Sequence, residues 1–287
     1  MSRAMRARKS ASAPVLASLF TLVLAACAPA PTTNAPASTT PAAATIPEIT
    51  IRASEYAFES PDQVDAGILL ITYENKGTRL HNVVIGRLKE GKTLEDFKAA
   101  APNGGPAVVP LVDLFGGSTG GFAGERHQVI LDLIEGPYVI FSFEHMGADP
   151  IDVARGMFRP LTVVARKSTV AAPEPAAQVS AVVRDNASFE IPSEITAGKQ
   201  TWKITNQGAI FHPFAVWRFV PGRTLADLVE FIKTYTGTPP ADKIGGVEQL
   251  SPGKRAWAIL DLTPGDYVVL DPGAAPNRAK STTFSIK

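Results

Sequence analysis

The amino-acid sequence predicts an all-β protein built from two copies of one β-sandwich domain. Three observations predict this. The chain has 23 glycines and 24 prolines among 287 residues but only 19% charged residues, a composition typical of turn-rich β proteins rather than helical bundles. Short apolar or alternating runs recur between turn residues, as expected for strands. The second half of the chain also repeats the motifs of the first half.

Residues 1–27 predict a lipoprotein signal peptide. Four basic residues precede an apolar segment that covers residues 15–24, the usual order of a secretory signal. Cys27 ends the tetrapeptide Leu-Ala-Ala-Cys, which resembles the lipobox of bacterial lipoproteins, where the cysteine is diacylated and becomes the mature N-terminus. Lipidation of Cys27 would anchor the protein in a membrane of the cell envelope, facing the periplasm or the exterior.

The charge of the mature chain argues against a nucleic-acid partner. The first 27 residues hold 4 of the 28 basic residues and no acidic one, so 28 − 4 = 24 basic residues remain against 27 acidic ones. Without a basic cluster, phosphate neutralisation is not expected. Cys27 is the sole cysteine, so no disulfide can form within the folded part. No later apolar stretch is long enough to span a bilayer.

Composition and repetition divide the mature chain into four parts. Residues 28–46 are almost entirely Ala, Pro, Thr and Ser, and we expect them to form an extended tether. A first domain is predicted over residues 47–166 and a second over residues 178–287. The Pro- and Ala-containing segment 167–177 joins them.

The duplication rests on matched motifs at two offsets. At an offset of 131, the matches are Phe58 with Phe189, Pro61 with Pro192, Asn75, Gly77 and His81 with Asn206, Gly208 and His212, and Thr93-Leu94 with Thr224-Leu225. At an offset of 129, they are Gly116-Gly117 with Gly245-Gly246, Gly124 with Gly253, and Leu131, Leu133, Gly136, Tyr138 and Val139 with Leu260, Leu262, Gly265, Tyr267 and Val268. Matching of this density indicates one supersecondary unit used twice.

Each copy is expected to consist of strands with one short inserted helix. In the first copy, strands are expected at residues 68–73, 83–85, 128–133 and 138–141. Leu225, Leu228, Val229 and Ile232 follow helical spacing in the second copy. Thr224 with Asp227, and Thr93 with Asp96, resemble capping boxes. The three tryptophans, at 202, 217 and 257, lie on strand-like segments and are expected in the core.

Other site motifs are weak. Residues 116–121 form a glycine-rich segment that lacks the lysine of a phosphate-binding loop, so we interpret it as a flexible loop. No Gly-x-Ser-x-Gly motif occurs. Ser142 lies near His145 in sequence but has no obvious orienting carboxylate for a hydrolytic triad.

The motif order resembles that of the cupredoxins, the plastocyanin and azurin relatives. Asn75, His81, Tyr138, Ser142 and Met157 follow the order of that family's copper-site segments. The resemblance covers both copies and implies two tandem cupredoxin-like Greek-key sandwiches. It also implies copper ligands at His81, His145 and Met157.

The family's ligand cysteine falls on Ser142. Blue copper centres depend on a thiolate together with two imidazoles and a weak axial ligand, so a blue centre is not expected. An alternative alignment, anchored on Gly156-Met157, places Asp152 rather than His145 at the second histidine position.

The second copy keeps His212 but has Asp271 at the position of Ser142, and residues 272–280 contain no His, Cys or Met. A histidine kept without other ligands indicates a structural role, which could also apply to His81. The leading hypothesis is therefore a non-enzymatic envelope lipoprotein with a modified, non-blue copper-binding first domain and a metal-free second copy. The alternative is a metal-free structural or protein-interaction module with an envelope partner. The third hypothesis, a redox enzyme or electron carrier, lacks the paired His-x-His ligands of two-domain cupredoxin enzymes.

Overall fold

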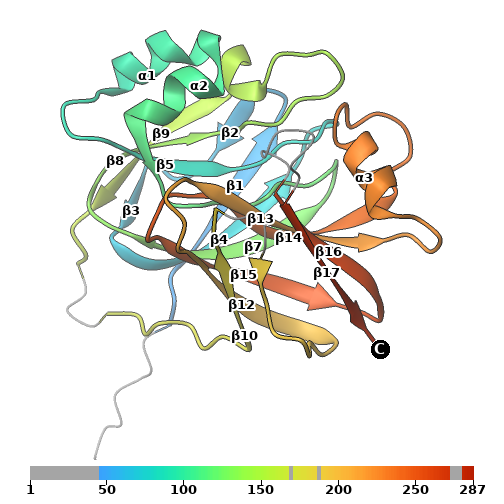
Figure 1. The fold of residues 1–287 in the computed structure, drawn as a ribbon. Helices are drawn as coiled ribbons and strands as arrows, with labels where there is room; N and C mark the ends of the chain where they lie inside the picture. The colour runs from blue at the N-terminus through green and yellow to red at the C-terminus, as the bar shows by residue number, and fades with distance from the viewer. Residues whose placement is uncertain (1–44, 168–170, 186–188, 272–279) are drawn as a thin grey trace, which may run out of the picture. The chain divides into compact units, whose positions relative to one another are not determined.

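The computed structural model describes residues 45–167, 171–185, 189–271 and 280–287. The predicted signal peptide, Cys27 and nearly all of the tether lie outside these residues. In the described ranges, no helix is long and apolar enough to cross a membrane. Figure 1 shows the two halves, with the first half in blue to green and the second in yellow to red.

The first half carries its strands in two sheets. Its strands are β1 (Glu48–Ser54), β2 (Ala57–Glu59), β3 (Gln63–Asp65), β4 (Gly67–Asn75), β5 (Val84–Leu88), β6 (Val112–Leu114), β7 (Arg126–Leu133), β8 (Gly136–Phe141) and β9 (Phe158–Val164). The sheet orders are β2-β1-β4-β7 and β3-β9-β8-β5-β6. Strand β1 runs parallel to β4, and β7 pairs with β4 antiparallel. The chain changes sheet between β2 and β3, as in a Greek-key sandwich.

The second half repeats this arrangement. Its strands are β10 (Val179–Val183), β11 (Phe189–Glu190), β12 (Gly198–Asn206), β13 (His212–Phe219), β14 (Ala241–Leu250), β15 (Arg255–Leu262), β16 (Gly265–Asp271) and β17 (Lys280–Ile286). Their orders are β11-β10-β12-β15 and β14-β13-β16-β17. Strand β10 is parallel to β12, as β1 is to β4. The predicted all-β fold of two cupredoxin-like sandwiches is therefore confirmed.

Short helices cover the second sheet of each half. The first half has α1 (Leu94–Ala100) and an unexpected α2 (Gly105–Val108), with short 3₁₀ turns at Ala101–Asn103, Val109–Leu111 and Asp152–Arg155; the second half has α3 (Leu225–Phe231). Both predicted capping boxes form, at Thr93 and Thr224. Phe97 of α1 packs on Phe141 of β8 at 5.2 Å between ring centroids. Figure 1 shows α1 and α2 over the β5–β8–β9 region.

The core is aromatic in the second half. Trp202, Trp217 and Trp257 are each at most 1% exposed, so the prediction that all three pack in the core is confirmed. Trp202 contacts Phe214 and Phe284. Such rings bury large apolar areas and stabilise the core of this half.

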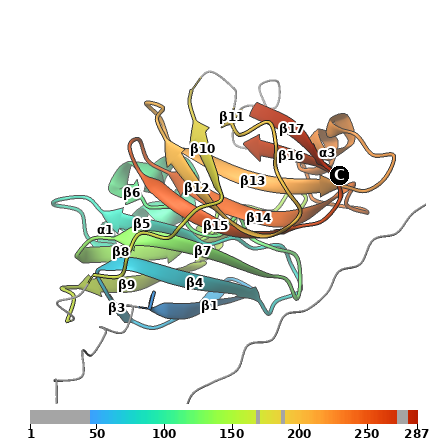
Figure 2. The same ribbon diagram turned by 90° about the horizontal axis from the view of Figure 1, so that it is seen from below.

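The two halves share one eight-stranded sheet, which the sequence did not predict. Strand β7 pairs antiparallel with β15, its own counterpart, and Val129 lies opposite Ala258. These two residues are equivalent at the offset of 129. The pairing is therefore quasi-twofold symmetric, like an isologous dimer interface. Figure 2 shows β7 and β15 side by side within the sheet.

The glycine-rich segment 116–121 is buried rather than a flexible surface loop, so the sequence interpretation is wrong. Ser118 bridges to Val247 of β14, which is also its equivalent at the offset of 129. A Cβ atom at Gly117 would lie 1.9 Å from the carbonyl oxygen of Val83, and one at Gly246 would lie 2.0 Å from that of Phe214. Gly117 and Gly246 therefore serve close backbone packing between strands.

Ionisable groups are buried between the halves. Lys243 of β14 lies 3.1 Å from the Glu144 carboxylate, and Glu248 is buried close by. Burial raises the pKa of Glu248 from 4.5 to about 7, and the Glu144 charge adds to this effect, whereas Lys243 opposes it. The fold therefore tolerates an ionised Glu248 at a cost in free energy.

Replacing Gly117 with Ala should strongly destabilise the protein. Backbone strain at the φ of 138° costs about 1–3 kcal/mol, and the clash with Val83 adds an overpacking cost of about 1–3 kcal/mol. Denaturant unfolding measures the effect. The control is Gly124→Ala, which has φ of 82° but no atom within 4 Å of the added Cβ. Equal losses for both variants would contradict this packing role.

Replacing Glu248 with Gln should stabilise the protein at high pH only. Because the folded pKa is the higher one, Glu248 contributes stability below its unfolded pKa of 4.5, and this contribution is lost as the pH rises through about 7. Above about pH 8 the variant should therefore be more stable than the natural protein by about 3 kcal/mol. Unfolding followed against pH measures this difference. Exposed Glu230→Gln should show no such dependence, and a pH-independent difference for Glu248→Gln would contradict the assignment.

Candidate functional site

An asparagine turn positions the candidate histidine in each half. Asn75 donates from Nδ2 to the carbonyl oxygens of Arg79 and Gly121, at 2.5 and 2.8 Å, and its Oδ1 accepts from Gly77 N. The repeated Asn-x-Gly motif thus shapes the loop that leads to His81. Asn206 makes the same three hydrogen bonds in the second half. Its Nδ2 donates to the carbonyl oxygens of Ile210 and Leu250, and its Oδ1 accepts from Gly208 N.

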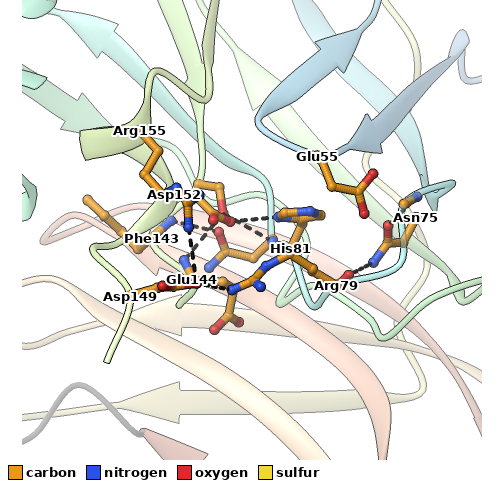
Figure 3. Close-up of polar contacts among 12 residues, drawn as sticks. Glu55, Asn75, Arg79, His81, Phe143, Glu144, Asp149, Asp152 and Arg155 are labelled. Carbon is orange, nitrogen blue, oxygen red and sulfur yellow. Dashed lines mark hydrogen bonds and ion pairs between the residues drawn. The ribbon is translucent and has the colours of Figure 1, made fainter. Parts of the chain in front are cut away.

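His81 faces a carboxylate inside the first half. Its Nδ1 lies 2.7 Å from Asp152 Oδ2, and Ser142 Oγ donates to the same oxygen at 2.7 Å. All three residues are buried. Since a carboxylate accepts hydrogen bonds, this contact places a ring proton on His81 Nδ1. Figure 3 shows the Asp152 carboxylate next to the His81 ring.

An aromatic ring and an ion-pair network cover His81. Tyr56 meets the imidazole edge-on at 6.2 Å between ring centroids, and the Arg155 guanidinium lies 3.9 Å from the centre of the Tyr56 ring. Asp149 pairs with both Arg155 and Arg79, at 3.0 and 2.6 Å. These contacts hold segment 145–155 over the histidine and leave His81 0% exposed.

The second half holds its histidine between two carboxylates. His212 Nδ1 lies 3.0 Å from Asp271 Oδ2, and its Nε2 lies 3.0 Å from Asp185 Oδ1. Asp185 also accepts hydrogen bonds from the backbone of Ala209 and Ile210. The Ala209 bond is the main cause that lowers the pKa of Asp185, and the His212 contact adds to it.

The two histidines differ at Nε2. Glu55 is the counterpart of Asp185, because it accepts from Thr78 N and Oγ1 as Asp185 accepts from Ala209. The backbone bond from Thr78 lowers the pKa of Glu55 to about 2. The buried Nε2 of His81, however, has no hydrogen-bond partner among the described residues. Among the described residues, the first half therefore offers a buried imidazole nitrogen that makes no hydrogen bond.

The other predicted ligands are placed differently. Met157 is 0% exposed and packs in the apolar core, and its backbone N donates to Asp152 O at 3.0 Å. His145 packs edge-on against Tyr235 of the second half, at 6.0 Å between ring centroids. The contacts of His145 thus lie at the interface of the halves, and those of His81 lie within the first half. Sequence spacing alone could not separate these two environments.

The donor set does not fit a blue copper centre. The cupredoxin resemblance would put the Ser142 hydroxyl at the thiolate position and the Asp152 carboxylate at the second imidazole position, and these two groups are hydrogen-bonded to each other. In the part of the chain that the structure describes, no group of three or more His, Cys, Asp or Glu side chains is arranged to hold a metal ion. The arrangement is no hydrolytic triad either, because Ser142 and His81 both bond Asp152 rather than each other.

Comparison with known proteins found no matching family model and no matching curated protein. Among solved structures, the chain is similar to dithionite-reduced auracyanin from Roseiflexus castenholzii (21% identity, 41% of this chain, 96% of that chain, TM-score 0.29). It is also similar to auracyanin A, a "blue" copper protein from Chloroflexus aurantiacus (21% identity, 41% of this chain, 99% of that chain, TM-score 0.27). A multicopper oxidase is similar over both halves (13% identity, 84% of this chain, 88% of that chain, TM-score 0.25). The fold assignment rests on strand order and register rather than on these similarities.

Proposed function

We propose that this protein is a lipid-anchored, non-enzymatic binding module of the cell envelope that does not use its cupredoxin-like sites for electron transfer. One observation carries the proposal. Asp152 accepts hydrogen bonds from both His81 and Ser142, so the groups at three ligand positions satisfy one another. A redox copper centre needs those groups free to bind the ion.

The second half supports the same conclusion by a different route. His212 is held by Asp271, which comes from the strand position equivalent to Ser142, and by Asp185. In each half, a carboxylate thus provides the hydrogen-bond acceptor that the buried imidazole requires, although the carboxylates come from different positions in the two halves. This favours a structural role for both histidines.

Copper binding at His81, His145 and Met157 remains the competing hypothesis. The lack of a hydrogen-bond partner for His81 Nε2 among the described residues is the observation that favours it, because imidazole nitrogen is a common ligand of copper. A labile single-imidazole contact would differ from a resident copper cofactor in both affinity and spectrum.

Copper titration of the fragment from residue 43 onward separates these hypotheses; residues 43–287 form one compact unit. We expect no stoichiometric binding and no change of melting temperature, because the ligand-position groups are already hydrogen-bonded. Stoichiometric binding that His81→Ala abolishes would overturn the proposal in favour of the copper hypothesis.

A gain-of-binding variant provides the positive control. The double variant Ser142→Cys/Asp152→His restores a thiolate and a second imidazole beside His81, and copper should then give an intense charge-transfer band in the visible range. Asp152→His alone lacks the thiolate and should give none. If the double variant also stays colourless with copper, the assignment of Ser142 and Asp152 to ligand positions is wrong.

Membrane anchoring is tested at Cys27. Expressed in a bacterial host, the natural chain should incorporate radiolabelled fatty acid and sediment with membranes. Cys27→Ser removes the acyl acceptor and should release the protein, since each buried CH₂ contributes about 0.8 kcal/mol to anchoring. Unchanged labelling and sedimentation of Cys27→Ser would contradict lipidation at this residue.

A further inference from the structure

A partly open cavity lies between the two halves; Asn82 and Pro213 line it, but His81 and His212, which precede them in the sequence, do not. Its volume is about 180 Å³, and residues of both halves line it, among them Glu144, His145, Trp217, Tyr235, Lys243 and Glu248. The share of one water molecule in liquid water is about 30 Å³. The cavity therefore has room for a small organic molecule.

The lining carries more negative than positive charge. Glu144 is paired with Lys243. Among the described residues, the hydrogen-bond partners of Glu248 are neutral, the Asn82 side chain and the Gln249 backbone, and the Lys243 charge acts on Glu248 without a hydrogen bond. Burial and the Glu144 charge raise the pKa of Glu248 to about 7. A cation in the cavity would relieve this cost, because an opposite charge nearby favours the ionised carboxylate.

Two polar atoms of the lining lack partners. Trp217 Nε1, in a residue only 1% exposed, and Gln249 Oε1 are buried without a hydrogen-bond partner among the described residues. Buried polar groups are nearly always hydrogen-bonded. The Trp217 N–H group and the Gln249 amide oxygen could therefore bind a small ligand that has both a hydrogen-bond acceptor and a hydrogen-bond donor.

The walls suit an organic cation. Trp217, Tyr235 and His145 contribute aromatic rings, and aromatic faces attract ammonium groups. The Lys243 ammonium already lies 5.3 Å from the centre of the Trp217 ring, so the rings of Tyr235 and His145 are the ones left for a guest. Tyr235 has a φ of 50°, a left-handed conformation that is costly for this residue type. The absence of a three-ligand cluster in the described ranges argues against a metal ion as the guest.

The fold itself does not require these side chains. In the first half, the positions equivalent to Trp217, Lys243 and Glu248 are held by Gly86, Leu114 and Thr119. Strand register supports this equivalence, because Gly86 pairs with Leu114 as Trp217 pairs with Lys243. The same scaffold thus forms with uncharged residues at all three positions, so the charges are a feature of this one cavity.

We propose that the cavity between the halves binds a small organic amine, as its ammonium ion, through the Glu248 carboxylate, with Trp217 Nε1 donating to an acceptor atom of the same ligand. This proposal names a ligand class for the binding module proposed above and rests on it to that extent. It does not depend on whether His81 binds copper.

The test uses ethanolamine, which carries an ammonium group and a hydroxyl, with the fragment from residue 43 onward. Calorimetric titration in the presence of a chelator should show saturable binding, and the neutral analogue ethylene glycol should not bind. Glu248→Gln should weaken ethanolamine binding at least about tenfold, because it removes the charged partner of the ammonium group. The matched control, exposed Glu230→Gln, should bind normally.

Failure of folding does not confuse this test, since Glu248→Gln removes a buried charge and is expected to be at least as stable as the natural chain. Trp217→Phe keeps an aromatic wall but removes the N–H donor, and it should weaken ethanolamine more than methylammonium, which has no acceptor atom. Absence of saturable binding, or equal binding by Glu248→Gln, would overturn the proposal. Because the chelator removes copper, either result leaves the copper titration as a separate test of the proposed function.

Discussion

The loop end of each sandwich depends on one interaction, the hydrogen bond between a buried imidazole and a carboxylate. In the first half, the Asp152 carboxylate joins the loop that follows β4, through His81, to the end of β8, through Ser142. A metal ion bound at these positions would join the same segments. A buried ionisable pair of this kind stabilises a fold only when its remaining hydrogen bonds are satisfied, and Ser142 supplies one of them. The carboxylate can thus organise the loops without a metal ion.

The shared sheet covers an edge strand that each copy of the sandwich would otherwise expose. A separate sandwich would leave β7 or β15 as an exposed edge strand, and such edges invite pairing with other chains. Pairing β7 with β15 removes both edges, and the crossing at Val129 and Ala258 places the two copies about a quasi-twofold axis. Because Ser118 and Val247 also lie opposite each other, the same axis passes through both contacts. The buried glycines 117 and 246 are needed there because the backbones approach too closely for a Cβ atom.

Much of the fold could be predicted from the sequence because it depends on local patterns. The capping boxes, the Asn-x-Gly turns and the alternation of β4 each act over a few residues, and the duplication doubles each signal. The pairing of β7 with β15 could not be predicted, since a half-buried strand has the same alternation of apolar and polar residues whether its edge is free or paired. The buried segment 116–121 was misread because glycines favour both flexible loops and close backbone contacts. For the site, the Gly156-Met157 anchor pointed to Asp152, but only the fold could show which of Asp152 and His145 faces His81.

The two halves show how one constraint admits different solutions. Each keeps a histidine after the same Asn-x-Gly turn, and each must give the buried ring an acceptor. The first half takes the acceptor from the 3₁₀ turn that begins at Asp152, so Ser142 remains as a donor to it. The second half takes it from Asp271, at the position of Ser142, and adds Asp185 at Nε2. Because Glu55 bonds Thr78 rather than the ring, the Nε2 of His81 has no hydrogen-bond partner within the described ranges, unlike that of His212. Besides helix α2 and the 3₁₀ turns of the first half, the two copies therefore differ at His81 Nε2 and at the cavity beside Glu248, where the side chains go beyond what the duplicated scaffold requires.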